Sequence, residues 1–384
     1  MAIGALLLPA LAAQEAATPI SRAQFAAAYL RFETALQGVK LGTLDEIRVN
    51  KTFDALTLLF FTGSLAKAME NLNALTDSID PKAPPALSVD LEARKAKAET
   101  MRAEAASIKA RIDALAPVKP GLIQAQAASA ARADLLARPF DAADTAQALM
   151  DPAALLAQIK QEAADLARGK NPFAGRKGDY WRVIKTGDRT IPVRLFCPAG
   201  VDASKPLPLI IAFHGSGGDE NMFMDGYGAG LIKKLAAEHK AVLATPRTEP
   251  FAGARGAEAF DDLLRAVGAD YSIDPKRVYV LGHSMGGMTT NALLVTRGEE
   301  IAAAACLCGF QGFAEGASGI PPTLIVAGEL DPIVSPARIE PAFQKARAAG
   351  FPVEYRVIPN YGHTLTVGKV LPAVAAWLFS RGRV

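Results

Sequence analysis

The chain has 384 residues, half of them hydrophobic, which is enough for two average domains with sizeable cores. Lys and Arg total 42 against 39 Asp and Glu, so the net charge is only +3. A balance this small and dispersed excludes the strong attraction that nucleic acids or anionic membrane surfaces require. We therefore expect a small or neutral ligand and no nucleic-acid partner.

The first 20 residues, which begin MAIGALLLPALAAQEAATP, predict a signal peptide. An apolar stretch of suitable length precedes Ala10-Leu11-Ala12, a small-x-small pattern of the kind that signal peptidases cut, but no basic residue comes before it. We expect export to the periplasm or the medium, with a buried helix of a cytoplasmic protein as the alternative. Another apolar run, residues 55–66, is shorter than the roughly 20 residues of a membrane span, so we expect it in a core.

Residues 21–170 predict a helical domain. They are rich in Ala, Leu, Glu, Lys and Arg, nearly free of glycine, and interrupted by proline clusters at 81–85 and 117–120. Between Leu91 and Leu115, apolar residues recur at seven-residue spacing in two interleaved series. Fewer than four heptads favour antiparallel helix packing within the chain over an intermolecular coiled coil.

Residues 171–384 predict an α/β domain, because apolar runs there alternate with amphipathic helices. Strands are expected at 180–187, 189–198, 207–215, 241–246, 277–282, 302–309, 322–328 and 353–359, and helices around 231–238, 257–267, 285–296, 336–349 and 369–379. Strands that are apolar on both faces and separated by helices indicate a doubly wound, mainly parallel sheet between two helical layers. Ligands bind beyond the carboxyl ends of such strands.

The cysteines and histidines predict neither a disulfide framework nor a metal site. Cys306 and Cys308 lie two residues apart in an apolar run, where they do not bridge, and we expect these and Cys197 to be free and packed. The histidines are scattered along the chain, without metal-ligand spacing: His214, His239, His283 and His363. The sequence therefore implies no metal and no cofactor.

The stretch LGHSMGG places Ser284 between an apolar strand and a helix. In a Gly-x-Ser-x-Gly motif of this kind the serine lies on a sharp, strained turn, and Gly282 and Gly286 leave room for the neighbouring strand and helix. Ser284 is therefore our candidate nucleophile. The alternative is an ordinary serine that caps a helix.

A serine nucleophile needs a histidine base, which in turn needs a carboxylate to orient it. His363, in the turn-like NYGHT after an apolar run, is the best candidate, because His239 ends an amphipathic helix, His283 would point away from the serine, and His214 belongs to an earlier strand end. Asp331 lies at a strand end between serine and histidine, as this chain order requires. Glu329 is its rival, and a turn-forming aspartate before proline is the other interpretation of Asp331.

Backbone N–H groups must stabilise the oxyanion that forms during acyl transfer. One candidate is the N–H of Met285, directly after the nucleophile. The second lies in FHGSGGDEN, residues 213–221, where the N–H of Ser216, or that of Gly217, can face the reacting carbonyl. A plain glycine-rich turn is the alternative, and the phosphate-binding and dinucleotide-binding patterns are both missing.

Together, HGSGGDEN, IDPKRVYVLGHSMGG, GELDPIV and YGHT resemble, in this order, the α/β-hydrolase family and specifically its esterase and depolymerase branches. The resemblance covers roughly residues 179–384. It implies the α/β-hydrolase fold, Ser284 as nucleophile, His363 as general base and acid, Asp331 as orienting carboxylate, and Ser216 and Met285 as oxyanion donors. The stretch DPKRVYVLGHSMGG is equally similar to the catalytic domain of prolyl-oligopeptidase-like serine peptidases, although these often carry a β-propeller where this chain predicts helices. The helical domain resembles no family that we recognise.

The sequence thus predicts a carboxylic ester hydrolase that works through an acyl-enzyme on a small-molecule or polymeric ester. A serine peptidase and a non-catalytic binding protein on the same fold are the alternatives, and the oligomeric state is open. Five apolar residues in loops after strands are candidates for an acyl pocket, or else are packed beneath those loops: Phe223, Met224, Phe251, Phe310 and Phe313.

Overall fold

The computed structural model describes residues 20–86, 90–115 and 120–382. Residues 1–19, which hold the apolar stretch and the cleavage motif of the predicted signal peptide, lie outside the described residues. Within the described ranges, no helix combines the length and the apolar composition needed to cross a membrane.

An eight-stranded sheet forms the centre of the described chain, in the order β1-β2-β4-β3-β5-β6-β7-β8. The strands are β1 (Gly178–Thr186), β2 (Arg189–Cys197), β3 (Leu207–Phe213), β4 (Val242–Pro246), β5 (Ile273–His283), β6 (Ala303–Leu307), β7 (Thr323–Gly328) and β8 (Val353–Ile358). β1 and β2 form an antiparallel hairpin at one edge, β2 pairs antiparallel with β4, and all the other pairs are parallel. The fold class predicted from the sequence is confirmed, and every predicted strand is present.

Helices cover both faces of the sheet. Successive residues of a strand point to opposite faces, so each strand contributes to an apolar cluster on either side. Leu209 and Ile211 of β3 belong to one apolar cluster, together with α9 and α10, while Ile210 and Ala212 belong to a second, together with α8 and α12. The helices are α8 (Leu231–Glu238), α9 (Gly256–Asp270), α10 (Met285–Arg297), α11 (Pro336–Ala348) and α12 (Thr366–Phe379). All five match predicted helices. Short helical turns lie between these elements at η2 (Met222–Gly226), η3 (Tyr227–Gly230), η4 (Glu249–Phe251) and η5 (Gly298–Glu300).

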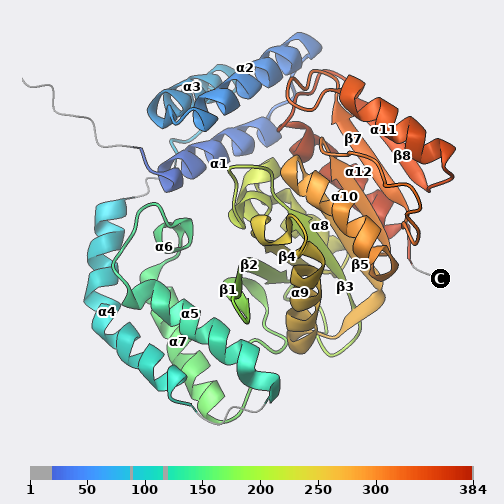
Figure 1. Cartoon of the computed structure of the whole chain (residues 1–384). Coiled ribbons are helices and arrows are strands. Elements are labelled where there is room, and N and C mark those ends of the chain that lie inside the picture. The colour runs from blue at the N-terminus through green and yellow to red at the C-terminus, as the bar shows by residue number, and fades with distance from the viewer. Residues whose placement is uncertain (1–19, 87–89, 116–119, 383–384) are drawn as a thin grey trace, which may run out of the picture.

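The N-terminal helices form two groups that lie on different sides of the sheet (Figure 1). The first group is α1 (Arg22–Gly38), α2 (Thr43–Phe61) and α3 (Leu65–Ile79); the second is α4 (Leu91–Asp113), η1 (Pro120–Leu122), α5 (Ile123–Ala137), α6 (Thr145–Leu149) and α7 (Pro152–Ala167). Phe32 and Phe53 of the first group share an apolar cluster with Tyr227, and Ile108 and Ile159 of the second share the other cluster with β1. Both groups are therefore packed onto the cores of the sheet.

The seven-residue apolar spacing lies on α4, as predicted. Ala98, Ala105 and Ile112 of one series and Ile108 of the other are buried. These residues face α5 and α7, which pack against α4. The repeat therefore serves helix packing within the chain.

A buried ion pair ties the second helical group to the sheet. Arg132 of α5 donates to Glu162 of α7, with 2.9 Å between Nε and Oε1, and both side chains are almost fully buried. The same guanidinium donates to the carbonyl oxygen of Trp181 in β1 and to the side chain of Gln158. Arg176 adds a second bond to Glu162 at 2.7 Å. The guanidinium of Arg132 thus joins three elements, α5, α7 and β1.

We expect Arg132→Met to lower the free energy of unfolding by about 3 to 5 kcal/mol, because removing one partner leaves the carboxylate of Glu162 buried and undercompensated. Urea unfolding followed by circular dichroism measures the change. Lys109→Met is the matched control, since its ion pair with Asp113 is partly exposed and should be worth less than about 1 kcal/mol. Equal effects of the two variants would contradict this account of Arg132.

Candidate active site

Ser284 lies on the sharp turn between β5 and α10, as predicted. Its φ of 53° and ψ of −117° lie in a region that costs a non-glycine residue energy. The turn is held by a hydrogen bond from the N–H of Ser284 to the carbonyl of Leu307 at 2.8 Å, and by one from the N–H of Met288 to the carbonyl of Ser284 at 3.0 Å. The hydroxyl makes no capping hydrogen bond to α10. The alternative of a helix-capping serine is therefore wrong.

Gly282 and Gly286 have the steric role that the motif predicts. A Cβ atom at Gly286 would collide with the carbonyl oxygen of Phe213 at the end of β3, and one at Gly282 would collide with the carbonyl oxygen of Gly286 in α10. Only glycine permits this close approach of strand, turn and helix. The backbone of the turn is thus fixed by its neighbours.

His363 and Asp331 are joined by a buried hydrogen bond of 2.7 Å between Nδ1 and Oδ2. Both side chains are almost completely buried. The other oxygen of Asp331 accepts the N–H groups of Ile333 and Val334, each at 2.8 Å. Burial by itself would raise the pKa of Asp331, but the hydrogen bond and charge of His363 and these two N–H groups outweigh it and hold the pKa below its ordinary value. Asp331 is therefore an ionised partner for the histidine.

Glu329 does not compete with Asp331 for this role. Its side chain is exposed, and its Oε2 accepts the N–H of Asn360 at 2.9 Å. The turn after β7 therefore directs Asp331 inward and Glu329 outward. The preference for Asp331 over its rival agrees with this geometry.

The imidazole of His363 lies close to the nucleophile turn but makes no hydrogen bond to Ser284 in this structure. Its ring centre is 4.7 Å from that of His283, the residue directly before Ser284. Since Nδ1 is committed to Asp331, Nε2 is the nitrogen left to act on the serine. Hydrogen bonds between nucleophile and base are often long before substrate binds. A rotation of the Ser284 hydroxyl or of the His363 ring would be needed to form the bond between them.

His283 connects three parts of the candidate site: the turn of Ser284, the segment of Tyr227 and the loop of His363. Its Nε2 lies 3.1 Å from the carbonyl oxygen of His363, and its Nδ1 lies 2.8 Å from the hydroxyl of Tyr227. A carbonyl can only accept, so Nε2 carries the proton, and the tyrosine hydroxyl donates to Nδ1. The same hydroxyl accepts the N–H of Gly215 at 3.4 Å. Burial lowers the pKa of His283 well below its ordinary value, which keeps the ring neutral.

His283, His363 and Cys308 have ligand-type atoms within 4.8 Å of one another, although the sequence scatters them. Their spacing along the sequence did not reveal that two of the histidines come together in the fold. The group does not fit a metal ion, because both nitrogens of His283 are hydrogen-bonded and Nδ1 of His363 is bound to Asp331. Burial also raises the pKa of Cys308, which disfavours the thiolate that would bind metal. All three cysteines are free and buried, as predicted.

The two remaining histidines have structural surroundings. Nε2 of His214 accepts the N–H of Thr248 at 3.0 Å, and its side chain is buried. His239, at the end of α8, stacks on Phe379 of α12 with ring centres 3.9 Å apart. Neither ring is close enough to Ser284 to make a hydrogen bond with it.

The glycine-rich loop after β3 lies against the nucleophile turn, where the oxyanion donors are predicted. A Cβ atom at Gly215 would lie only 3.3 Å from the Cβ of Ser284. Within the described chain, neither the N–H of Ser216 nor that of Met285 has a hydrogen-bond acceptor. Two unpaired donors beside the serine are available for a developing negative charge, and their role stays a prediction.

The loop residues considered for an acyl pocket are packed in cores instead. Phe223, Met224, Phe251 and Phe310 are each at most 3% exposed, and the ring of Phe313 packs edge-on against that of Phe310. Of the two interpretations that the sequence left open, packing beneath the loops therefore holds for these four side chains, and the lining of an acyl pocket does not.

Sequence reasoning missed the contacts of α2 with the loop that holds His363, which lies more than 300 residues further along the chain. Both carboxylate oxygens of Asp54 accept the N–H of His363, at 3.1 and 3.2 Å, and Oδ1 of Asn50 accepts the N–H of Gly362 at 2.9 Å. Burial raises the pKa of Asp54 to about 6, even though the N–H and the charge of His363 oppose that shift. Asn50 and Asp54 are four residues apart on the face of α2 that also carries Val49 and Phe53, and two polar residues on an apolar helix face were the available signal.

The other end of α2 contacts the predicted oxyanion loop. A Cβ atom at Gly217, whose φ is +77°, would lie 2.8 Å from a ring carbon of Phe60 and 3.1 Å from one of Phe61. α2 therefore extends from the loop that holds His363 to the loop that holds Ser216.

α1 contacts the segment that holds Tyr227, next to the candidate site. The side chain of Glu33 is buried and accepts the hydroxyl of Tyr29 at 2.6 Å and the N–H of Gly228 at 3.2 Å. Burial raises the pKa of Glu33 to about 7. Gly228 follows Tyr227, whose hydroxyl binds His283, so α1 fixes the segment that holds this tyrosine.

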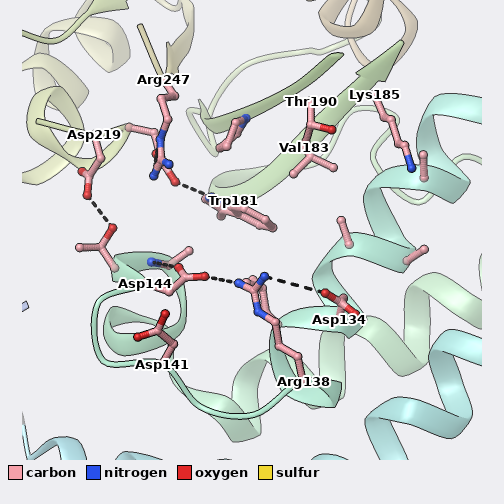
Figure 2. A pocket seen from close by; sticks show the side chains of 18 of the residues that line it. Asp134, Arg138, Asp141, Asp144, Trp181, Val183, Lys185, Thr190, Asp219 and Arg247 are labelled. Atoms are coloured by element: carbon pink, nitrogen blue, oxygen red, sulfur yellow. Dashed lines mark hydrogen bonds and ion pairs between the residues drawn. The ribbon is translucent and has the colours of Figure 1, made fainter. Parts of the chain in front are cut away.

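A polar cleft of about 970 Å³ opens between the second helical group and β1, and Gly218 of the glycine-rich loop contributes to its lining. Figure 2 shows Arg138 near Asp134 and Asp144, and Asp219 near α6, with Trp181 on the sheet side. The hydroxyl of Thr145 donates to Asp219 at 2.5 Å, and Arg247 pairs with Glu220 at 3.2 Å. Many of the charged groups of the cleft therefore compensate one another.

No protein-family model matches the chain, and no curated protein matches it. Similar solved structures include a thermostable esterase, 22% identical with a TM-score of 0.46 over 53% of this chain and 63% of that one, so this chain spans less than two thirds of its length. A fluorophosphonate-binding serine hydrolase of Staphylococcus aureus is 17% identical, with a TM-score of 0.44 over 52% and 96%. The feruloyl esterase module of Clostridium thermocellum is 16% identical, with a TM-score of 0.45 over 53% and 88%.

We expect Asp54→Asn to stabilise the protein at pH 8 but not at pH 4. The pKa of Asp54 rises on folding from 3.8 to about 6, so its stabilising contribution is complete below pH 4 and is lost as the pH rises through 6. This shift corresponds to about 3 kcal/mol, which an amide does not lose. Urea unfolding of both proteins across this pH range measures the difference.

Asp45→Asn is the matched control on the same helix, because Asp45 is exposed and its ion pair with the exposed Arg48 should be worth less than about 1 kcal/mol. A wild-type minus Asp54→Asn difference that stays constant from pH 4 to pH 8 would show that the folded protein does not penalise the charge of Asp54.

Proposed function

We propose that this chain, an α/β-hydrolase by fold, is a serine hydrolase that cleaves carboxylic esters through Ser284, His363 and Asp331. The observation that carries the proposal is the buried bond between His363 and Asp331, next to a serine held at a φ of 53°. A protein without catalytic activity has no physical need for this strained turn. The strain therefore favours an enzyme over a binding protein on the same fold.

In the first step Nε2 of His363 takes the proton of the Ser284 hydroxyl while Oγ attacks the ester carbonyl carbon. The carbonyl electron pair moves to oxygen, and the N–H groups of Ser216 and Met285 stabilise the resulting anion. Asp331 holds the imidazole in the tautomer that leaves Nε2 free, and it stabilises the imidazolium that forms. The ionised state of Asp331 suits this task.

In the second step the bond from carbon to the alkoxy oxygen breaks, and His363 returns its proton to the leaving alcohol. The acyl group then remains on Ser284. Water attacks this acyl-enzyme while His363 takes one of its protons, and cleavage of the acyl bond to Oγ returns that proton to Ser284. The net reaction consumes one ester and one water and releases one acid and one alcohol.

Ser284→Ala is expected to reduce kcat on p-nitrophenyl acetate by at least about a thousandfold, and His363→Gln to do the same, since triad members act as one unit. Both variants should also lose labelling by a fluorophosphonate. Ser204→Ala and His239→Gln, at positions away from the site, are the controls. An unlabelled but folded wild-type protein, or a Ser284→Ala variant that keeps its rate, would rule out this function.

Export is a second proposal, and it rests on the apolar stretch before Ala10-Leu11-Ala12. The purified protein is then expected to lack its first residues, because a signal peptidase cuts behind a small-x-small pattern. Mass spectrometry of the protein purified from its own host measures where the chain starts. A protein that keeps residues 1–12 and stays in the cytoplasm would contradict this proposal.

A further inference from the structure

Exposed large apolar side chains are concentrated on α2. Leu44, Leu58 and Phe61 of this helix are 82%, 57% and 52% exposed. Isolated exposed leucines are common on protein surfaces, but adjacent exposed apolar side chains beside a candidate site can mark a binding surface. Leu44 lies at the beginning of the helix, whereas Leu58 and Phe61 lie in its last turns, where α2 meets the predicted catalytic loops.

Leu58 lies on the face of α2 that contacts the histidine loop. Asp54, four residues earlier, accepts the N–H of His363. Residues four apart on a helix lie on the same face, one above the other. Leu58 is therefore one turn beyond the carboxylate that binds the backbone of the proposed base.

Phe61, the last residue of α2, lies against the loop of the proposed oxyanion donors. Its ring and that of Phe60 approach Gly217, the residue after Ser216. Phe60 is held between Phe25 of α1, with ring centres 5.2 Å apart, and Phe61, at 5.6 Å in an edge-on arrangement. The position of Phe61 is thus set by aromatic packing, although half of its surface remains exposed.

We propose that Leu58 and Phe61 form an acyl-binding surface that favours esters of straight acyl chains of six or more carbons. This inference rests on the proposed function. The loop aromatics next to the proposed nucleophile are enclosed in cores, whereas these apolar groups of α2 are exposed. They lie between the His363 loop and the Ser216 loop, where the chain of a bound ester would leave the reacting carbonyl. Contact with such a surface is worth up to about fourfold per buried methylene.

The test compares kcat/KM for p-nitrophenyl octanoate with that for p-nitrophenyl acetate. We expect Leu58→Ser and Phe61→Ser each to lower the octanoate-to-acetate ratio about fivefold, and the double variant to lower it by more than tenfold. Leu58→Met should keep most of the wild-type octanoate-to-acetate ratio, because the methionine side chain keeps the apolar contact. Leu44→Ser is the control: it also replaces an exposed leucine of α2, but at the far end, and should leave both rates unchanged.

The outcomes distinguish the surface from the proposed function. Fluorophosphonate labelling and melting curves show whether each variant is folded and has a reactive serine. A labelled double variant with the wild-type ratio overturns the acyl-binding surface and leaves the proposed function standing. A wild-type protein that neither hydrolyses these esters nor takes up the label overturns the proposed function, and the acyl-binding surface with it.

Discussion

The buried hydrogen bond between His363 and Asp331 is the contact on which the candidate site depends. It fixes which nitrogen of the ring is free, and it requires an ionised carboxylate in a place where burial alone would neutralise it. The N–H groups after Asp331 meet that requirement, because they are aimed at its second oxygen by the turn after β7. A strand end thus supplies both the acid and the donors that keep it charged.

The N-terminal helices belong to this arrangement as much as the sheet does. α2 binds the backbone of His363 through Asp54 and touches the loop of Ser216 through two phenylalanines. α1 fixes the segment of Tyr227, whose hydroxyl links the glycine-rich loop to His283. Because these contacts meet at both loops that flank Ser284, the relative position of the loops depends on residues 22–61.

Most of the sheet could be predicted from the sequence, because buried parallel strands are continuous apolar runs bounded by turn residues. The turn at Ser284 was predictable too, since Gly282 and Gly286 are dictated by local steric contacts. The contacts of α2 were not, because Asp54 meets His363 across 309 residues and its own neighbours suggest an ordinary core helix. The sequence left the placement of the loop phenylalanines open for a related reason, because their burial depends on which element covers each loop.

The site also contains several features that destabilise the folded chain. Ser284 has a backbone conformation that side chains disfavour, Asp54 has its pKa raised by burial, and Asp331 repels it across the same histidine. None of these three features improves packing. Such conflicts concentrate where chemistry requires a fixed geometry, since the surrounding structure must hold groups in states that they would otherwise leave. Their convergence beside the imidazole of His363 and the hydroxyl of Ser284 is a physical argument for the proposed active site that does not depend on any sequence motif.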